Sequence, residues 1–334
     1  MTDWRIHEGD ALEVLRDEVA ASCVQTCVTS PPYWGLRDYG IEGQIGLEPT
    51  PEEYVERLVM VFREVRRVLR DDGTLWLNLG DSYARSPEKG EKFRGKSRQF
   101  LQHNANGLSG PSVPEHLKPK DLVGTPWRVA FALQADGWYL RSDIIWAKPN
   151  PMPESVTDRP TKAHEYLFLL AKRERYYYDA EAIREPARPE SASRYAYGFK
   201  DKKSGTTKGM RECGEHQPRG DSVPIVSLDQ NPLGRNRRTV WTIPTQPFAA
   251  AHFAVFPPAL VEPCILAGAP ERGVVLDPFA GSGTVGVVCR KHRRRFVGIE
   301  LNPEYAQMAR GRLGEDVTPE AKTKTLSLFD RSRG

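Results

Sequence analysis

Apolar and polar residues follow two periods along the chain, one typical of buried strands and the other of amphipathic helices. Residues 24–29 and 74–79 are short, mostly apolar runs, which predicts buried strands. Between them, residues 51–69 carry apolar side chains at helical spacing, with Thr50 as N-cap and Pro51 at the first helical position. Strands that alternate with helices indicate a doubly wound, mostly parallel α/β sheet.

The same alternation returns twice further along the chain. We expect a helix over 120–135, strands over 139–147 and 166–170, a helix over 258–267, strands over 273–276 and 296–299 with a helix between them, and a last helix from 303 to about 313. Two polar segments, 84–119 and 181–238, lack apolar periodicity, and long loops of this kind are commonly functional. We therefore divide the chain into 1–180, 181–238, 239–314 and a polar tail over 315–334.

Composition narrows the classes of protein that the pattern allows. The chain has 334 residues, of which 39% are hydrophobic and 28% charged, and this balance is typical of a folded globular protein. No apolar run approaches the roughly 20 residues that span a bilayer, and the first residues do not resemble a signal peptide, so we expect a cytoplasmic protein. The five cysteines are scattered without ligand spacing, which indicates neither a disulfide framework nor a metal site.

A glycine-rich segment follows the expected strand over 273–276. In Asp277-Pro-Phe-Ala-Gly-Ser-Gly-Thr-Val-Gly286, the glycines at 281, 283 and 286 satisfy the GxGxxG pattern. Small residues allow the backbone to approach a ligand, and the helix N-terminus points N–H groups at it. Glu300 ends the next strand, where a carboxylate is placed to accept hydrogen bonds from ribose hydroxyls. The segment predicts a nucleotide-type cofactor, and a tight turn without a ligand is the alternative.

Only one helix and a tail follow Glu300, so the rest of the sheet must come from residues before the glycine loop. A nicotinamide-dependent oxidoreductase of the usual Rossmann type has the opposite order. The order in this chain therefore indicates a circularly permuted sheet.

The segment Thr29-Ser-Pro-Pro-Tyr-Trp34 ends the expected strand over 24–29. Two successive prolines fix φ and remove two backbone donors, which leaves carbonyl acceptors in a rigid turn. Ser30 Oγ and the Pro31 carbonyl are then candidate acceptors for an amino group, with Tyr33 or Trp34 as a stacking face. A rigid turn that only packs its aromatic residues is the alternative. Both motifs follow strands of one sheet, so we expect them at the same edge.

Ser-Pro-Pro-Tyr followed far downstream by Asp-Pro-Phe-Ala-Gly-Ser-Gly-Thr resembles the amino-methylating DNA methyltransferases, and the motif order resembles their β class. The resemblance implies a Rossmann-like class I methyltransferase that uses S-adenosyl-L-methionine and acts on double-stranded DNA. A cognate restriction endonuclease and the oligomeric state are left open. Residues 1–180 would then form the catalytic half of the domain and 239–314 the cofactor half.

The resemblance also assigns roles to individual residues. The catalytic motif is Ser30, Pro31, Pro32 and Tyr33, with Tyr33 and Trp34 as stacking candidates for a flipped base. The residues expected to bind the cofactor are Asp10, Asp277, Phe279, Gly281, Gly283, Thr284, Glu300 and Phe253.

The polar segments are candidates for DNA contacts. In 181–238, Arg235, Arg237 and Arg238 flank Asn236, and such side chains read base edges. In 84–119, we expect Lys92, Arg94 and Lys96 to contact DNA. Charge-rich solvated loops are the alternative for both.

Within the resembling family, Ser at position 30 is usual for cytosine-directed enzymes, so we favour N4 of cytosine over N6 of adenine as the methylated atom. A hydroxyl accepts from the amine and rotates to donate, which suits cytosine with its acceptor N3. Two hypotheses from other classes remain: a nicotinamide-dependent oxidoreductase and a catalytically silent nucleic-acid-binding module. The first has no use for paired acceptors at Ser30, and the second has no use for an intact cofactor loop.

Overall fold

The structure is a computed structural model that describes residues 3–84, 117–186, 234–246 and 257–314. The chain divides into two compact units, one formed by residues 1–178 and 239–334 and the other by residues 179–238. Each unit is described by itself. Within the described residues, no helix has both the length and the apolar character needed to cross a membrane.

The larger unit contains eight strands and six main helices among its described residues. The strands are β1 (Trp4–Glu8), β2 (Val24–Thr29), β3 (Leu69–Leu79), β4 (Tyr139–Ala147), β5 (His164–Ala171), β6 (Val240–Thr242), β7 (Val274–Asp277) and β8 (Arg295–Glu300). The helices are α1 (Ala11–Glu18), α2 (Pro51–Val68), α4 (Thr125–Ala135), α6 (Pro258–Gly268), α7 (Thr284–Lys291) and α8 (Pro303–Arg312).

The strands form one sheet in the order β1-β8-β7-β2-β3-β5-β4-β6. Neighbouring strands are parallel except where β5 runs antiparallel to β3 and β4. From β7 the chain passes through α7 to β8 on one side, and from β2 it passes through α2 to β3 on the other. The order therefore reverses between β7 and β2, which is where open α/β sheets bind ligands. The predicted doubly wound, mostly parallel fold is confirmed.

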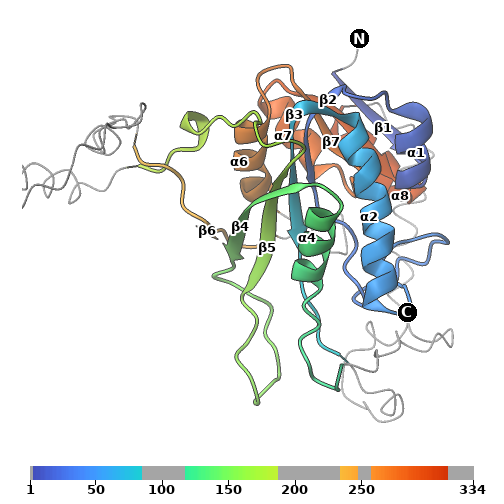
Figure 1. The fold of residues 1–334 in the computed structure, drawn as a ribbon, viewed down its shortest axis with the longest axis vertical. Coiled ribbons are helices and arrows are strands. Elements are labelled where there is room, and N and C mark those ends of the chain that lie inside the picture. The colour runs from blue at the N-terminus through green and yellow to red at the C-terminus, as the bar shows by residue number, and fades with distance from the viewer. Residues whose placement is uncertain (1–2, 85–116, 187–233, 247–256, 315–334) are drawn as a thin grey trace, which may run out of the picture. The chain divides into compact units, whose positions relative to one another are not determined.

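Helices cover both faces of the sheet. Helix α2 packs against α1 and α4 on one face, and α7 packs against α6 and α8 on the other (Figure 1). Thr50 Oγ1 accepts a hydrogen bond from Glu53 N at 3.2 Å, so α2 begins at the predicted cap. The buried side of α2 includes Tyr54, Leu58 and Phe62, all without solvent exposure. Through the Tyr54 hydroxyl, this face also contacts the turn that follows β2.

Some boundaries differ from the sequence expectations. Strand β3 begins at Leu69, directly after α2, although the polar residues that follow suggest a turn before Thr74. They stay extended because Lys172 N donates to Gly73 O at 3.1 Å and Tyr177 N donates to Asp72 O at 2.9 Å. The helix expected over 120–135 begins only at Thr125. Backbone hydrogen bonds from residues far away in the sequence therefore override the turn that the local polar residues predict.

The α2 face provides a test of the core. Replacing Phe62 with Ala should lower the free energy of unfolding by about 3–5 kcal/mol, because the side chain is fully buried and leaves a cavity. Met60→Ala is the matched control on the same helix, since Met60 is 41% exposed and its loss should cost less than about 0.5 kcal/mol. Urea unfolding of both variants measures the difference, and equal losses would contradict this packing.

Candidate active site

The two sequence motifs meet where β2 and β7 end. The strands pair in parallel, with Cys27 opposite Leu276. Beyond this pair, Thr29 Oγ1 donates a hydrogen bond to Asp277 Oδ1 at 2.6 Å, joining residues 248 positions apart. The amide of Phe279 donates to the same oxygen at 3.1 Å. The expectation that both motifs share one edge of the sheet is confirmed.

The three glycines of the loop serve different physical needs. Gly281 has φ +52°, and a Cβ added there would meet nothing within 4 Å, so its outer side is open. Gly283 has φ +78°, and a Cβ there would lie 2.9 Å from Ala309 Cβ in α8. At Gly286 a Cβ would lie 2.6 Å from the ring of Phe296 in β8. Of the two glycines predicted to bind the cofactor, only Gly281 faces open space, and Gly283 is required by packing.

Two carboxyl groups, those of Asp277 and Glu300, accept hydrogen bonds from backbone amides of the loop. Glu300 Oε2 accepts from Gly281 N at 2.7 Å, and its Oε1 accepts from Asn302 N at 2.8 Å. Burial raises the pKa of Glu300 above its ordinary value. Burial also raises the pKa of Asp277 to about 7, although the hydrogen bonds from Thr29 and Phe279 act in the opposite direction. Burial therefore disfavours the charged forms of both carboxyl groups, and a ligand that donates hydrogen bonds to them would offset this cost.

Two other predicted cofactor residues have structural partners. Asp10 caps α1, because its Oδ1 accepts from Leu12 N at 2.8 Å. It follows β1, and Gly9 N donates to Glu300 O at 3.0 Å, so Asp10 lies at the same edge as Glu300. Thr284 is 3% exposed, and its Oγ1 accepts from Arg312 at 3.4 Å. The Thr284 side chain is therefore buried against α8, and its contact with the cofactor stays a prediction.

Arg312 braces the glycine loop from α8. Its Nη1 donates to Ser282 O at 2.7 Å and to Ser282 Oγ at 2.8 Å. Burial lowers the pKa of the guanidinium. The loop conformation therefore depends on the last strand-helix unit as well as on its own glycines.

The turn after β2 is fixed from both sides. Tyr54 in α2 donates its hydroxyl to the Pro32 carbonyl at 2.9 Å. Among the described residues, no donor reaches the Pro31 carbonyl. Trp34 is only 5% exposed and its indole N–H donates to Glu48 O at 2.9 Å. The hypothesis that Trp34 offers a stacking face is wrong, because its ring belongs to the core.

Ser30 and Tyr33 belong to a cluster that the sequence analysis did not anticipate. Ser30 Oγ lies 3.3 Å from Asn78 Oδ1 and 3.3 Å from Tyr33 Oη. Tyr33 Oη donates to Glu165 Oε2 at 2.8 Å, and Lys148 Nζ pairs with Glu165 Oε1. Asn78 sits near the end of β3, Glu165 near the start of antiparallel β5, and Lys148 just after β4. The sequence does place a polar residue at or beside the end of each of these three strands, and this pattern is the signal that could have identified the cluster.

Burial governs the tyrosine of this cluster. Burial first, and then the adjacent Glu165 carboxylate, raise the pKa of Tyr33 well above its ordinary value, so the phenol stays protonated. Gly80 lies beneath the ring, because a Cβ there would be 2.5 Å from Tyr33 Cε2. Gly80, like Asn78, Glu165 and Lys148, is a residue of the site that sequence patterns alone did not identify.

In the smaller unit, Glu185 holds two of the predicted DNA-binding arginines. Arg235 Nε and Arg238 Nε donate to Glu185 Oε2 at 3.1 and 3.0 Å. Burial alone would raise the pKa of Glu185, but the hydrogen bonds from Arg238 and Arg235 lower it below the ordinary value. Arg235 is also paired through the backbone with Glu185. These arginines are therefore oriented by an acidic partner within their own unit.

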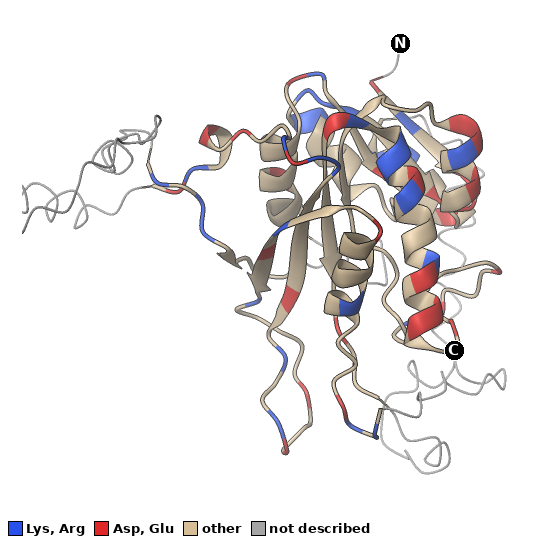
Figure 2. Cartoon of the chain, in the orientation of Figure 1, with Lys and Arg blue, Asp and Glu red and all other residues tan. Residues whose placement is uncertain are grey.

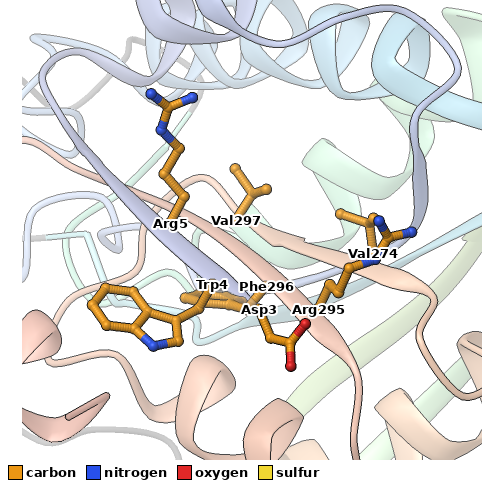
Figure 3. A pocket seen from close by; sticks show the side chains of 7 residues that line it. All are labelled: Asp3, Trp4, Arg5, Val274, Arg295, Phe296 and Val297. Carbon is orange, nitrogen blue, oxygen red and sulfur yellow. The ribbon is translucent and has the colours of Figure 1, made fainter. Parts of the chain in front are cut away.

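Several predicted residues lie outside the described part of the chain: Phe253, Lys92, Arg94 and Lys96. A surface hollow lies at the opposite edge of the sheet, near the beginning of β1 and β8, where Trp4 and Phe296 lie on one side of the strands and Arg5 and Val297 on the other (Figure 3). Neither motif contributes to it.

Known proteins resemble this chain over most of its length. The family model described as DNA methylase matches residues 24–311. The Type II methyltransferase M.Cfr9I of Citrobacter freundii is 51% identical over 93% of this chain and 88% of its own. M.SmaI of Serratia marcescens, also a Type II methyltransferase, is 49% identical over 92% of this chain and 90% of its own.

Solved structures share the fold. The PvuII DNA methyltransferase, described as cytosine-N4-specific, superposes with a TM-score of 0.61 at 18% identity, covering 99% of this chain and 93% of that one. A putative DNA modification methylase of Thermus thermophilus, TTHA0409, solved in complex with S-adenosyl-L-methionine, has a TM-score of 0.53 at 23% identity, covering 92% and 94%.

The buried Asp277 carboxyl predicts a pH dependence of stability. Its pKa is about 7 in the folded protein against an ordinary value of 3.8, so the folded state binds more protons between these values. Stability from this residue is thus full below about pH 4 and is lost as pH rises toward 7. Asp277→Asn keeps an acceptor for Thr29 and Phe279, so its stability relative to the unmodified protein should rise across this window. Urea unfolding of both proteins at several pH values measures the difference, and a constant difference would contradict a raised pKa.

Proposed function

The chain belongs to the amino-methylating DNA methylases, and from this membership we propose that it transfers a methyl group to N4 of cytosine in double-stranded DNA. The observation that carries the proposal is the pair of acceptors at the end of β2, Ser30 Oγ and the Pro31 carbonyl, which no donor among the described residues reaches, beside the glycine loop. N6 of adenine is the alternative target of the same chemistry.

S-adenosyl-L-methionine is the methyl donor in this family, and it supplies an electrophilic methyl group on a sulfonium. The residues present fit such a molecule, because a Cβ at Gly281 would meet no atom within 4 Å and the Glu300 carboxylate lies beside this glycine. We propose that Glu300 accepts from the ribose hydroxyls and that Asp277 and Phe279 lie at the methionine end. Asp10, at the end of β1, is proposed to accept from the adenine amine with the oxygen that does not cap α1.

The exocyclic amine of a base is a poor nucleophile because its lone pair is conjugated with the ring. Ser30 Oγ and the Pro31 carbonyl would each accept one amine hydrogen, which favours a tetrahedral nitrogen with its lone pair turned to the methyl group. The Pro32 carbonyl already accepts from Tyr54, so the proposed contribution of Pro32 is to hold the turn. Positioning of this kind contributes several kcal/mol to the rate, and acceptors strengthen as positive charge develops.

The choice of cytosine rests on Ser30. A neutral hydroxyl beside the Asn78 amide makes the acceptor uncharged, which suits a base whose neighbouring ring nitrogen N3 is itself an acceptor. The base must leave the duplex to reach Ser30, and the ring of Tyr33 is the proposed stacking surface. The likeness to the PvuII enzyme concerns the fold alone.

DNA contacts are proposed for two regions. Arg235, Arg237 and Arg238, in the unit over 179–238, are proposed to contact base edges, with Glu185 orienting two of them. Around the active site, positive and negative residues are interspersed on the loops that leave the carboxyl edge of the sheet (Figure 2). Among them, Lys118 and Lys120 are at least 80% exposed and pair with Asp121 and Asp158 at the surface, and we propose that they contact phosphates. Relatives named Type II methyltransferases support a site-specific role and a companion restriction endonuclease.

The two glycines of the loop separate cofactor binding from folding. Gly281→Ala should leave the protein folded, at a strain cost of about 1 kcal/mol from its positive φ, and weaken S-adenosyl-L-methionine binding about ten-fold or more, because the added methyl group enters the open space. Gly283→Ala should instead lower the free energy of unfolding by about 1–3 kcal/mol, because the methyl group overlaps Ala309. Calorimetric titration and urea unfolding of both variants measure these effects. Unchanged affinity in folded Gly281→Ala would reject the cofactor assignment.

The target atom is tested by identifying the product. DNA incubated with the protein and S-adenosyl-L-methionine, then digested to nucleosides, should contain N4-methylcytosine by mass spectrometry. Ser30→Ala should slow methyl transfer about ten-fold or more with little change in cofactor affinity, because one acceptor is lost. Finding only N6-methyladenine would overturn the choice of cytosine and leave the amine chemistry standing.

A further inference from the structure

Glu165 has a mostly buried carboxylate that lies near the proposed catalytic serine and contacts Tyr33 and Asn78. Its side chain is 16% exposed, and it sits near the start of β5. Oε2 accepts from Tyr33 Oη at 2.8 Å and lies 3.3 Å from Asn78 Nδ2. Oε1 pairs with Lys148 Nζ, and Lys148 is itself 17% exposed and lies over the ring of Trp146. A carboxylate so placed accepts hydrogen bonds from every neighbour and donates none.

This acceptor fixes the direction of the neighbouring hydrogen bonds. Asn78 Nδ2 donates to Glu165 and, at 3.0 Å, to Tyr166 O, so the amide oxygen Oδ1 must face Ser30 and Tyr33. Tyr33 has a single hydroxyl proton, and its contact with Glu165 at 2.8 Å is shorter than that with Asn78 at 3.1 Å. Asn78 Oδ1 is then left to accept the proton of Ser30 at 3.3 Å.

We propose that Glu165, held by Lys148, is a positioning residue that makes Ser30 Oγ an obligatory acceptor toward the target amine. The serine proton is directed at Asn78, so the oxygen lone pairs remain for the substrate. The inference rests on the proposed function, because it assigns a role only if an exocyclic amine is methylated. Glu165 itself touches neither the base nor the cofactor in this proposal.

The negative charge of Glu165 sets the direction of the hydrogen bonds in this cluster. In Glu165→Gln the Lys148 ammonium selects the new amide oxygen, which turns the amide nitrogen toward Tyr33 and Asn78. The amide nitrogen offers Tyr33 no acceptor, so Tyr33 donates instead to Asn78 Oδ1, 3.1 Å away, where it competes with Ser30. The serine proton displaced from Asn78 then turns toward the amine and opposes its acceptor role. Replacing Lys148 with Met as well removes the selection and permits the original direction.

The experiment compares single-turnover methyl transfer in four proteins: the unmodified chain, Glu165→Gln, Lys148→Met and the double variant. Glu165→Gln should transfer about ten-fold more slowly or worse, with S-adenosyl-L-methionine affinity and unfolding free energy nearly unchanged. The double variant should be faster than Glu165→Gln alone, a non-additive recovery that simple loss of packing does not produce. Glu154→Gln is the matched control, because Glu154 pairs with Arg159 in the β4–β5 connection and lies outside the cluster.

The outcomes separate this inference from the proposed function. An unmodified protein that methylates no exocyclic amine would overturn the proposed function and this inference with it. Normal amine methylation that is unaffected by Glu165→Gln would overturn only the inference. Additive losses in the double variant, or a parallel fall in stability and cofactor affinity in Glu165→Gln, would assign Glu165 a purely structural role and likewise overturn it.

Discussion

The parallel pairing of β2 with β7 is the constraint on which the site depends. It brings together two turns that are 248 residues apart, and the hydrogen bond from Thr29 to Asp277 joins their first residues. No single segment contains both an amine acceptor and a cofactor loop. The sheet supplies the common edge, and helices on both faces hold the two strands in register. Backbone pairing of β2 with β7 thereby sets the distance between the proline turn and the glycine loop.

Around this edge, the protein buries acceptors. The carboxyl groups of Asp277 and Glu300 face the glycine loop, and burial raises the pKa of both. Glu165, behind the serine, is balanced by Lys148. Buried acceptors without enough donors are costly, and a ligand rich in N–H and O–H groups relieves that cost. The distribution therefore fits a cofactor with ribose hydroxyls and a substrate that offers an amine.

Residues outside the two motifs hold the glycine loop and the proline turn in their conformations. Arg312 in α8 grips Ser282, and Ala309 fills the space beside Gly283. On the other side, Tyr54 in α2 restrains the proline turn, and Gly80 leaves room for the ring of Tyr33. The motifs carry the chemistry, whereas these neighbours decide where its atoms lie.

The sequence by itself determined the fold class, the permuted order of the motifs and their common edge, because strand and helix periods and turn chemistry are local properties. It also predicted roles for Ser30, Pro31 and Gly281, because residue type within a motif is a local property. Only the tertiary structure decided that Trp34 is core, that Gly283 and Thr284 serve packing, and that Asn78 and Glu165 stand behind Ser30. These decisions depend on which strands become neighbours. Burial and hydrogen-bond direction arise from contacts between residues far apart in the chain, so no local pattern specifies them.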